Sequence, residues 1–391
     1  MEATYDPGLL IVTLIAALAP LAMELPARFR PPIVVVEILL GILIGPHVLH
    51  WASPDGVVGT LGQLGLTFLL FLVGIEIDVW MIRGRLLALA VGGWFLSFLV
   101  AMACTLLLSS AGLIEAPPLL AAIALSTTAL GVLSPILKDS GEWNTDFGGW
   151  LLAAATMGEF APMVFMSLLL APTHPTVLHT LFMLFFVAVS LGSAYVAFHM
   201  LSSGTLARLA RTMEGSGQLP VRLCVLLQAL LVALAAQIGL NVVMGAFAAG
   251  MVVGLVSRDE PGNLLRQKLD AIGYGFLIPI FFIGVGMRFD LEALWSGPLV
   301  PVQIIVLLAL FLLVRGAPVV LYRAELAPAD RLPFALYSAT GLPLIAVIAE
   351  LGVSSGLMAP QHAVVLLSAA MLTVLLFPAL ALRLRREREI A

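Results

Sequence analysis

The chain has 391 residues, of which 61% are hydrophobic and only 11% are charged, and its formal net charge is −4. This composition excludes an ordinary soluble domain, and the small, dispersed charge offers no surface for nucleic acid. Both cysteines lie inside apolar segments, so a disulfide framework is not expected. We therefore expect a membrane protein.

Thirteen apolar segments follow one another along the chain, and each is a candidate membrane span. They are residues 8–23, 32–48, 57–77, 86–111, 117–137, 147–170, 177–200, 223–240, 242–256, 271–287, 299–321, 332–351 and 362–382. Several are short or contain glycine and proline, which indicates interrupted helices. The sequence thus predicts an all-α polytopic membrane protein with 13 transmembrane helices.

Basic residues are distributed unevenly among the connections between these segments. Every Lys and Arg except Arg288 and Arg315 lies in alternate connections, beginning with the first, or in the tail after residue 382. Because basic residues near spanning helices stay on the cytoplasmic side, this pattern predicts an N-terminus outside and a C-terminus in the cytoplasm. We expect a multi-pass protein of the inner or plasma membrane.

The two ends of the chain bear on whether the first span is retained and on how transport would be driven. The flank of the first segment contains Glu2 and Asp6 and no basic residue, whereas a signal peptide begins with a basic region. The stretch after residue 382 is too short for a nucleotide-binding domain, and no GxxxxGK[ST] phosphate loop occurs. We therefore expect a retained first span, no nucleotide-binding domain in this chain, and transport that is passive or driven by ion gradients.

The two halves of the sequence resemble each other. Residues 71–78 (FLVGIEID) match residues 281–290 (FFIGVGMRFD). The apolar segments that precede them, 32–48 and 242–256, each contain two glycines four residues apart. Matching segments are an odd number of spans apart, so they would cross the membrane in opposite directions. We predict one transmembrane domain over residues 1–391, with inverted repeats at about 8–170 and 223–382, a linker helix at 177–200 and a short cytoplasmic tail at 383–391. Inverted repeats with broken helices are typical of secondary transporters.

The fifth and twelfth segments are interrupted near their middle by small polar residues, glycine and proline. These residues are Ser126, Thr127, Thr128, Gly131 and Pro135 in the fifth segment, and Thr340, Gly341 and Pro343 in the twelfth. Where a helix unwinds inside a membrane, carbonyl oxygens and nearby hydroxyl groups can coordinate an alkali cation. The alternative for the two threonines of the fifth segment is a hydrogen bond back to the preceding helical turn. The sequence contains no His/Cys cluster with the spacing of metal ligands, so a transition-metal site is not expected.

Glu159 and Arg315 are the most deeply placed opposite charges, each inside an apolar segment. A charged side chain at the bilayer centre costs about 2.5–3.5 kcal/mol on insertion scales, so each needs a partner or a task. One interpretation is an ion pair that only fixes helix packing. The other is that Glu159 binds a cation and a proton in turn while Arg315 compensates its charge, because burial favours the neutral carboxyl group and a guanidinium favours the carboxylate.

Three other acidic residues are candidate accessory groups. Glu37 lies inside the second segment, where it could bond a broken helix or line an entrance. Glu76 and Asp78 end the third segment, where solvation at the membrane interface is a sufficient alternative explanation. The predicted cation site therefore consists of Glu159 and Thr128, with the other hydroxyl groups of the fifth segment nearby.

One stretch has the pattern of a known family. Residues 37–46 (EILLGILIGP) resemble the E-I-L-x-G-I-x-x-G-P signature of the monovalent cation:proton antiporter superfamily, in its Kef-like and sodium/proton exchanger branch. Residues 69–76 resemble the following helix of that family, and residues 277–287 resemble the matching helix of its second repeat. The resemblance covers nearly the whole chain. It implies a 13-helix fold with crossed broken helices, a dimerisation domain and a mobile core domain.

The resemblance also implies residue roles. The family's ion-binding carboxylate corresponds to Glu159, and its basic residue in the helix before the second broken one corresponds to Arg315. The chain departs from the family at Gly158, where Asp or Gln precedes the carboxylate in many members, and at residues 341–343, which lack the acidic residue of Kef-like proteins. A single carboxylate carries one cation or one proton in each half-cycle, so we expect electroneutral exchange.

These observations together predict a secondary active antiporter that exchanges H⁺ for Na⁺ or K⁺ by elevator-type alternating access, and not an enzyme. Its partners would be a monovalent cation, a proton and the lipid bilayer, with no cofactor; a homodimer is implied by the resemblance alone. Two alternatives remain open: a Na⁺-coupled symporter of an organic solute, and a non-transporting membrane sensor on the same fold. The symporter would need a larger polar cavity, and the sensor would not depend on Glu159.

Overall fold

The computed structural model describes residues 7–24, 33–76, 84–110, 117–169, 184–193, 217–257, 260–289 and 299–390, with residues 181, 195, 212 and 215. All regular structure in this part of the chain is helical. Of the linker helix predicted at 177–200, residues 184–193 are described and are helical. The predicted accessory residue Asp78 lies outside the described residues.

Eight helices of the described chain are long and apolar enough to cross a membrane. They are Gly56–Glu76, Arg85–Ser110, Asp146–Met166, Leu219–Gln237, Gly262–Met287, Val300–Val320, Pro328–Ser354 and Pro360–Arg385. The shorter apolar helices are Pro7–Ala22, Ile33–Ile44, Pro118–Ser134, Leu184–Ser193 and Val242–Val256. Each predicted segment overlaps one of these helices, which supports a multi-pass membrane protein. Only the longer set meets the length of a full span, so the number 13 stays a prediction.

The chain forms two compact units. The first contains Met1–Pro54, Ile82–Met166 and Phe282–Ala391, and the second contains Asp55–Met81 and Ser167–Phe281. Each unit is therefore assembled from stretches that lie far apart in the sequence.

In the first unit, helix α2 (Ile33–Ile44) touches the part of α13 (Ile278–Met287) that begins at Phe282, backbone against backbone. A Cβ atom at Gly41 would be 2.2 Å from a carbonyl oxygen of α13, and one at Gly286 would be 2.1 Å from a carbonyl oxygen of α2. Only glycine allows this approach, which is a common means of packing membrane helices.

In the second unit, helices α3 (Gly56–Glu76) and α11 (Val242–Val256) are joined in the same way. A Cβ atom at Gly250 would be 2.0 Å from a carbonyl oxygen of α3, and one at Gly74 would be 2.3 Å from a carbonyl oxygen of α11. These are the helices that the predicted internal repeat relates to α2 and α13. Each glycine contact thus joins one helix from each of the two proposed repeats, and the two contacts correspond to each other under the proposed repeat.

The second unit also contains the helix Leu184–Ser193, α10 (Leu219–Gln237) and α12 (Glu260–Ile272). Helix α12 continues through one π-helical turn (Gly273–Leu277) into α13. This helix begins well before the span predicted at 271–287. Residues 264–269 (LLRQKL) are good helix formers, so the charged stretch extends the helix instead of forming a connection.

The two interrupted helices both lie in the first unit. One consists of α5 (Pro118–Leu125) and α6 (Leu130–Asp139), and the other of α16 (Arg331–Ser338) and α17 (Pro343–Ser354). Four non-helical residues separate the halves in each case, 126–129 in the first and 339–342 in the second. These positions overlap the stretches in which the sequence predicts the two interruptions.

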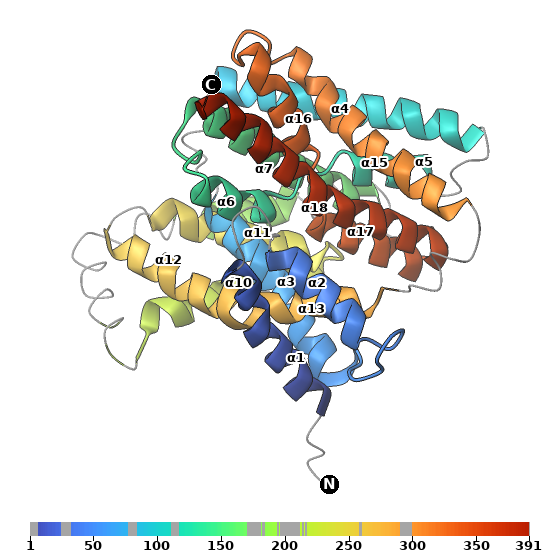
Figure 1. Ribbon diagram of the computed structural model, residues 1–391. Helices are drawn as coiled ribbons and strands as arrows, with labels where there is room; N and C mark the ends of the chain where they lie inside the picture. The colour runs from blue at the N-terminus through green and yellow to red at the C-terminus, as the bar shows by residue number, and fades with distance from the viewer. Residues whose placement is uncertain are drawn as a thin grey trace. The chain divides into compact units, whose positions relative to one another are not determined.

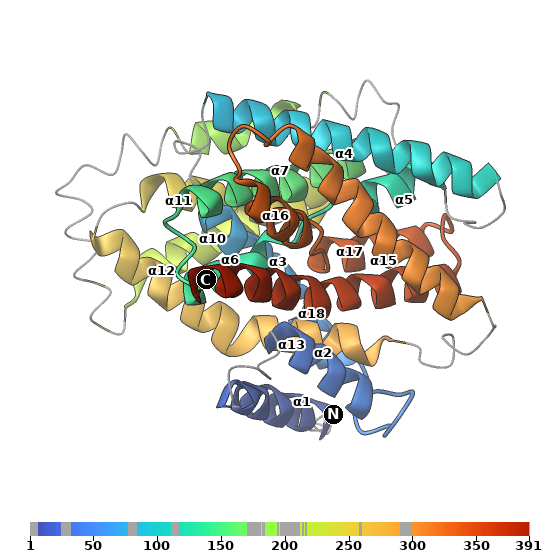
Figure 2. The ribbon, with the colours of Figure 1, turned by 45° about the horizontal axis from the view of Figure 1, so that its top comes forward.

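Long helices surround these interruptions within the same unit. They are α4 (Arg85–Ser110), α7 (Asp146–Leu169), α15 (Val300–Gly316) with its 3₁₀ extension (Ala317–Val320), and α18 (Pro360–Ile390). The same unit contains the helix α1 (Pro7–Leu18) with its 3₁₀ extension (Ala19–Glu24), and the 3₁₀ turn Pro328–Asp330. Helix α18 packs against α15, α16 and α17 (Figures 1 and 2). It runs through the predicted tail as far as Ile390, since Leu, Arg and Glu are strong helix formers.

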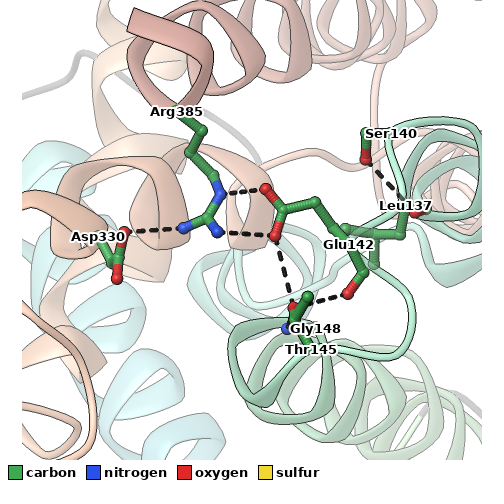
Figure 3. A network of polar contacts seen from close by, with 7 residues as sticks. All are labelled: Leu137, Ser140, Glu142, Thr145, Gly148, Asp330 and Arg385. Carbon is green, nitrogen blue, oxygen red and sulfur yellow. Dashed lines mark hydrogen bonds and ion pairs between the residues drawn. The ribbon is translucent and has the colours of Figure 1, made fainter. Parts of the chain in front are cut away.

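A polar network joins α18 to the ends of the interrupted helices. Arg385 Nε donates to Glu142 Oε1, and Arg385 Nη2 donates to Glu142 Oε2 at 2.7 Å. Arg385 Nη1 donates to Asp330 Oδ1 at 2.8 Å. Figure 3 shows the guanidinium between the two acids. Its Cζ atom also lies 3.8 Å from the ring centroid of Phe147. One side chain thus holds together the turn after α6, the start of α7 and the turn before α16.

We expect Arg385→Ala to destabilise the protein, because it leaves two poorly exposed carboxylates without their shared cation. Hydrogen bonds to charged groups contribute about 1.5–3 kcal/mol each, so the thermal unfolding midpoint in detergent should fall clearly. Arg85→Ala is the matched control: the Arg85 side chain is 68% exposed in its ion pair with Glu325, and such surface pairs contribute about 0–1 kcal/mol. Equal midpoints for the two variants would contradict this role for the network.

Candidate ion-binding site

The two interruptions meet and bond to each other. The amide N–H of Ala129, in the first interruption, donates to the carbonyl oxygen of Thr340 in the second at 2.7 Å. The Thr128 hydroxyl donates to the carbonyl oxygen of Ser338, the last residue of α16, at 2.6 Å. Non-helical backbone is therefore buried in protein at the crossing, which is where irregular backbone is tolerated at membrane depth.

Glu159, from the middle of α7, reaches the start of α6. Its Oε2 atom accepts a hydrogen bond from the amide N–H of Leu130 at 2.7 Å. Leu130 is the first residue of α6, so the carboxylate lies against the positive end of a helix dipole. The Glu159 side chain is buried, and its Oε1 atom has no hydrogen-bond partner among the described residues. One carboxylate oxygen is thus held by the protein while the other remains available to a ligand.

A proline explains how α7 contacts the first interruption. Pro162 lies inside α7 and has no N–H, so it cannot bond the carbonyl oxygen of Gly158 four residues earlier. That oxygen instead accepts a hydrogen bond from the amide N–H of Thr128 at 3.0 Å. Pro162 therefore leaves the Gly158 carbonyl oxygen free to accept a hydrogen bond next to Glu159. The sequence signal for this was a proline four residues after a glycine within an apolar helix.

Arg315, near the end of α15, reaches the same crossing. Its Nε atom donates to the Thr128 hydroxyl at 2.9 Å and to the carbonyl oxygen of Ser338 at 3.3 Å. Its Nη1 donates to the Ser97 hydroxyl at 3.2 Å and its Nη2 to the carbonyl oxygen of Ala154 at 3.3 Å. A cation near the carboxyl end of α16 is favourable for that helix dipole.

Arg315 and Glu159 do not form the direct ion pair that the sequence left open. Both side chains are buried, but the described residues contain no ion pair between them, and the guanidinium bonds to hydroxyl and carbonyl oxygens instead. The two charges are linked indirectly through the first interruption. This arrangement leaves the carboxylate free of a bound guanidinium.

A second proline supports Arg315 in the same manner as Pro162 supports Glu159. Pro318 cannot bond the carbonyl oxygen of Val314, four residues earlier. This oxygen accepts a hydrogen bond from the Ser97 hydroxyl at 2.9 Å, and the same hydroxyl accepts from Arg315. Ser97 therefore belongs to the candidate site, although the sequence analysis did not predict it. The available signal was a lone serine in the apolar helix α4 (Arg85–Ser110).

The other hydroxyl groups of the first interruption bond locally. Thr127 donates to the carbonyl oxygen of Ala124 at 2.8 Å, and Ser126 donates to that of Ile123 at 2.9 Å. For these two residues the structure therefore shows the bond to the preceding turn. Because a hydroxyl oxygen keeps its lone pairs when it donates, both remain able to coordinate a cation.

The predicted residues of the two interruptions divide between loop and helix. Thr340 and Gly341 lie in the second interruption, and Pro343 is the first residue of α17, where its missing N–H is tolerated. Gly131 and Pro135 lie inside α6 and not in the first interruption, because the helix already begins at Leu130, whose N–H is capped by the carboxylate of α7.

Thr373 of α18 is another residue that sequence reasoning missed. Its hydroxyl lies 3.1 Å from both the amide nitrogen and the carbonyl oxygen of Gly341. It can therefore fix the backbone of the second interruption.

Two of the candidate accessory residues, Glu37 and Glu76, are among the described residues. Glu37 is buried in α2, and none of the hydrogen bonds or ion pairs of the described residues joins it to the crossing. Glu76 ends α3 in the other unit. No group of three His, Cys, Asp or Glu side chains suited to a metal ion occurs in the described part of the chain. The crossing therefore offers one carboxylate oxygen, hydroxyl oxygens and backbone carbonyls, which are ligands for a hard monovalent cation.

The chain is similar in sequence to transporters. Residues 13–382 match the family described as sodium/hydrogen exchanger, transmembrane. The chain is 31% identical over 342 residues to YjbQ of Bacillus subtilis, covering 82% of this chain and 53% of that protein. It is 30% identical over 290 residues to Cation/H(+) antiporter 15 of Arabidopsis thaliana, covering 69% and 34%. It therefore spans about half or less of the length of these two relatives.

Two other proteins are matched over nearly their full length. The Na(+)/H(+)-K(+) antiporter GerN of Bacillus cereus is 23% identical over 383 residues, covering 94% of this chain and 93% of that protein. The solved structure of the sodium proton antiporter MjNhaP1 from Methanocaldococcus jannaschii at pH 8 has a TM-score of 0.70 at 16% identity, covering 98% and 96%. At that identity the structural likeness concerns the fold alone.

Proposed function

We propose that this chain, which belongs to the sodium/hydrogen exchanger family, exchanges H⁺ for a monovalent cation across a membrane. Members of this family are transporters and not enzymes. The observation that carries the proposal is the Glu159 carboxylate, buried at the crossing with one oxygen held by the N-terminus of α6 and the other without a partner among the described residues. A buried carboxylate of this kind needs either a proton or a cation.

Competition for one carboxylate couples the two ions. When Glu159 holds a proton it cannot bind a cation, and when it holds a cation it cannot bind a proton. The Thr128 and Thr127 hydroxyl oxygens and the backbone carbonyls of the first interruption would supply the other ligands, with Ser126 close by in the chain. The apparent affinity for the cation should therefore fall as the pH is lowered.

Arg315 provides a fixed positive charge close to the binding site. Its guanidinium bonds Thr128 and the carboxyl end of α16 instead of Glu159, so it can compensate the charge of the site without occupying the carboxylate. With one carboxylate that titrates and one guanidinium that stays charged, each half-cycle moves one cation or one proton. We accordingly propose electroneutral one-for-one exchange.

The movement that exposes Glu159 to each side would be of the elevator type. The matching glycine contacts of α2 with α13 and of α11 with α3, and the two interrupted helices, support the inverted repeats on which this mechanism depends. The homodimer, the outside N-terminus and the cytoplasmic C-terminus belong to the same proposal. The alternation of basic residues supports the orientation.

The test is a proteoliposome assay in which a pH gradient is dissipated by added Na⁺, K⁺ or Li⁺. We expect at least one of these cations to dissipate the gradient. Clamping the membrane potential with a potassium ionophore at fixed potassium, with Na⁺ or Li⁺ as the test ion, should leave the rate unchanged, because one-for-one exchange moves no net charge.

The outcomes separate the alternatives. A rate that depends on the clamp would contradict electroneutrality while keeping the exchange. Folded protein that responds to no alkali cation would contradict the antiporter, and would favour a solute symporter or a sensor instead.

A further inference from the structure

A small cavity lies next to Arg315, within the first unit. It has a volume of about 10 Å³, about the space that one water molecule needs. Its lining includes side chains from four elements, namely Trp94 of α4, Arg315 of α15, Tyr322 in the turn that follows, and Ser338 of α16. The proposed exchange of ions at Glu159 does not involve this space.

The cavity is lined by polar groups that lack partners. Trp94 Nε1, Tyr322 Oη and Ser338 Oγ are all buried, and none has a hydrogen-bond partner among the described residues. A buried polar group left unsatisfied costs about 1–3 kcal/mol, so three in one place call for a shared ligand.

Arg315 adds donors to the same cavity. A guanidinium has five N–H groups, and its contacts with Thr128, Ser97 and Ala154 engage one on each nitrogen. Two N–H groups of Arg315 are therefore unpaired within the described part of the chain. A second cation is excluded as the ligand, because the indole and the guanidinium can only donate and the guanidinium is positively charged.

We propose that the cavity is an internal water site that solvates Arg315. The water accepts hydrogen bonds from the Trp94 indole N–H and from the Arg315 guanidinium, and it donates to Tyr322 Oη and Ser338 Oγ. Four partners complete its tetrahedral bonding and satisfy all three orphan atoms. An anion would satisfy the same donors, but it would leave the acceptor lone pairs of both hydroxyl groups unused.

This water has a consequence for exchange, and that part of the inference rests on the proposed function. Among the described residues Arg315 has no carboxylate partner, and its charge is stabilised by the hydroxyl and carbonyl oxygens that it contacts. Removing the water weakens this shell and leaves the guanidinium better able to turn toward Glu159, where it competes with the cation. Trp94 and Tyr322 are therefore positioning residues that act on the cation site through Arg315.

Two measurements on the full chain test the proposal. The first is a density map at a resolution that shows ordered waters, from protein prepared with chloride and then with bromide. We expect a single peak within hydrogen-bond distance of Tyr322 Oη, Trp94 Nε1 and Arg315 in both maps, with no anomalous bromide signal. No peak, or a bromide signal at this position, would overturn the water site.

The second measurement is the concentration of Na⁺ or K⁺ that gives half-maximal exchange. Tyr322→Phe and Trp94→Phe each remove one partner of the water, and we expect this concentration to rise about two- to tenfold with the maximal rate retained. Tyr337→Phe is the matched control, since Tyr337 is buried in the same unit but does not line the cavity. An unchanged half-maximal concentration in both test variants would overturn the link between the water and exchange. A wild-type protein without any exchange would contradict the proposed function, and the density map would still test the water site on its own.

Discussion

We expect Glu159→Gln to abolish cation-dependent dissipation of the pH gradient while the protein stays folded. The amide has nearly the shape of the carboxyl group, and its oxygen can still accept the hydrogen bond that Oε2 now receives from Leu130. It cannot carry negative charge or exchange a proton. Loss of one partner of a buried ion pair costs about 3–5 kcal/mol, which corresponds to more than about a hundredfold in cation affinity. In proteoliposomes the rate should therefore reach that of vesicles without protein.

The control for this variant is another glutamate changed in the same way. Glu350 lies in α17 of the same unit, and its side chain is 60% exposed in a long contact of 3.8 Å with Arg288. Glu350→Gln should keep wild-type exchange. A Glu159→Gln protein that still exchanges cations, with a normal unfolding midpoint, would remove Glu159 from the role proposed for it.

The sequence predicts the fold well where chemistry is local. The interruption at residues 126–129 and the one at 339–342 are marked by Ser, Thr and Gly in otherwise apolar segments, and helix α7 is marked by length and hydrophobicity. The ends of helices are harder to predict from hydropathy. Residues 264–269 and 383–390 are charged enough to suggest a connection and a tail. They form helix because most of their side chains favour helix, a preference that hydropathy does not report.

The partners within the site could not be predicted in the same way. Hydropathy gives the depth of Glu159 and Arg315 in their segments, but it does not give the direction in which each side chain points around its helix. That direction decides that Arg315 bonds Thr128 and that Glu159 bonds the backbone of Leu130. The network of Arg385 with Glu142 joins residues 243 positions apart, and nothing local in either stretch indicates the pairing.

Gly158 explains why the guanidinium can approach the first interruption, and this gives the second large expected effect. A Cβ atom at Gly158 would lie 2.7 Å from Arg315 Nη2, 2.7 Å from Thr128 Oγ1 and 2.9 Å from Thr128 Cβ. A chain with any side chain at this position could not hold Arg315 as it is held here. The absence of a side chain at Gly158 thus leaves space that Arg315 and Thr128 occupy.

We expect Gly158→Ala to reduce exchange strongly, because the new methyl group forces Arg315 and Thr128 apart at the cation site. Overpacking of a well-packed interior costs about 1–3 kcal/mol, so the unfolding midpoint should fall as well. The measurement is the exchange rate in proteoliposomes together with the cation concentration for half-maximal rate.

Gly149→Ala is the matched control, since Gly149 lies on the same helix α7 and a Cβ atom there would meet no atom within 4 Å. Alanine is the better helix former by about 1 kcal/mol, so this variant should be as stable as the wild type or more so, with normal exchange. If both variants behave alike, the close packing of Arg315 and Thr128 on α7 has no part in binding the cation. If only Gly158→Ala loses exchange, the contact between α7, Arg315 and the first interruption is required for transport, because the two substitutions differ only in what the added methyl group meets.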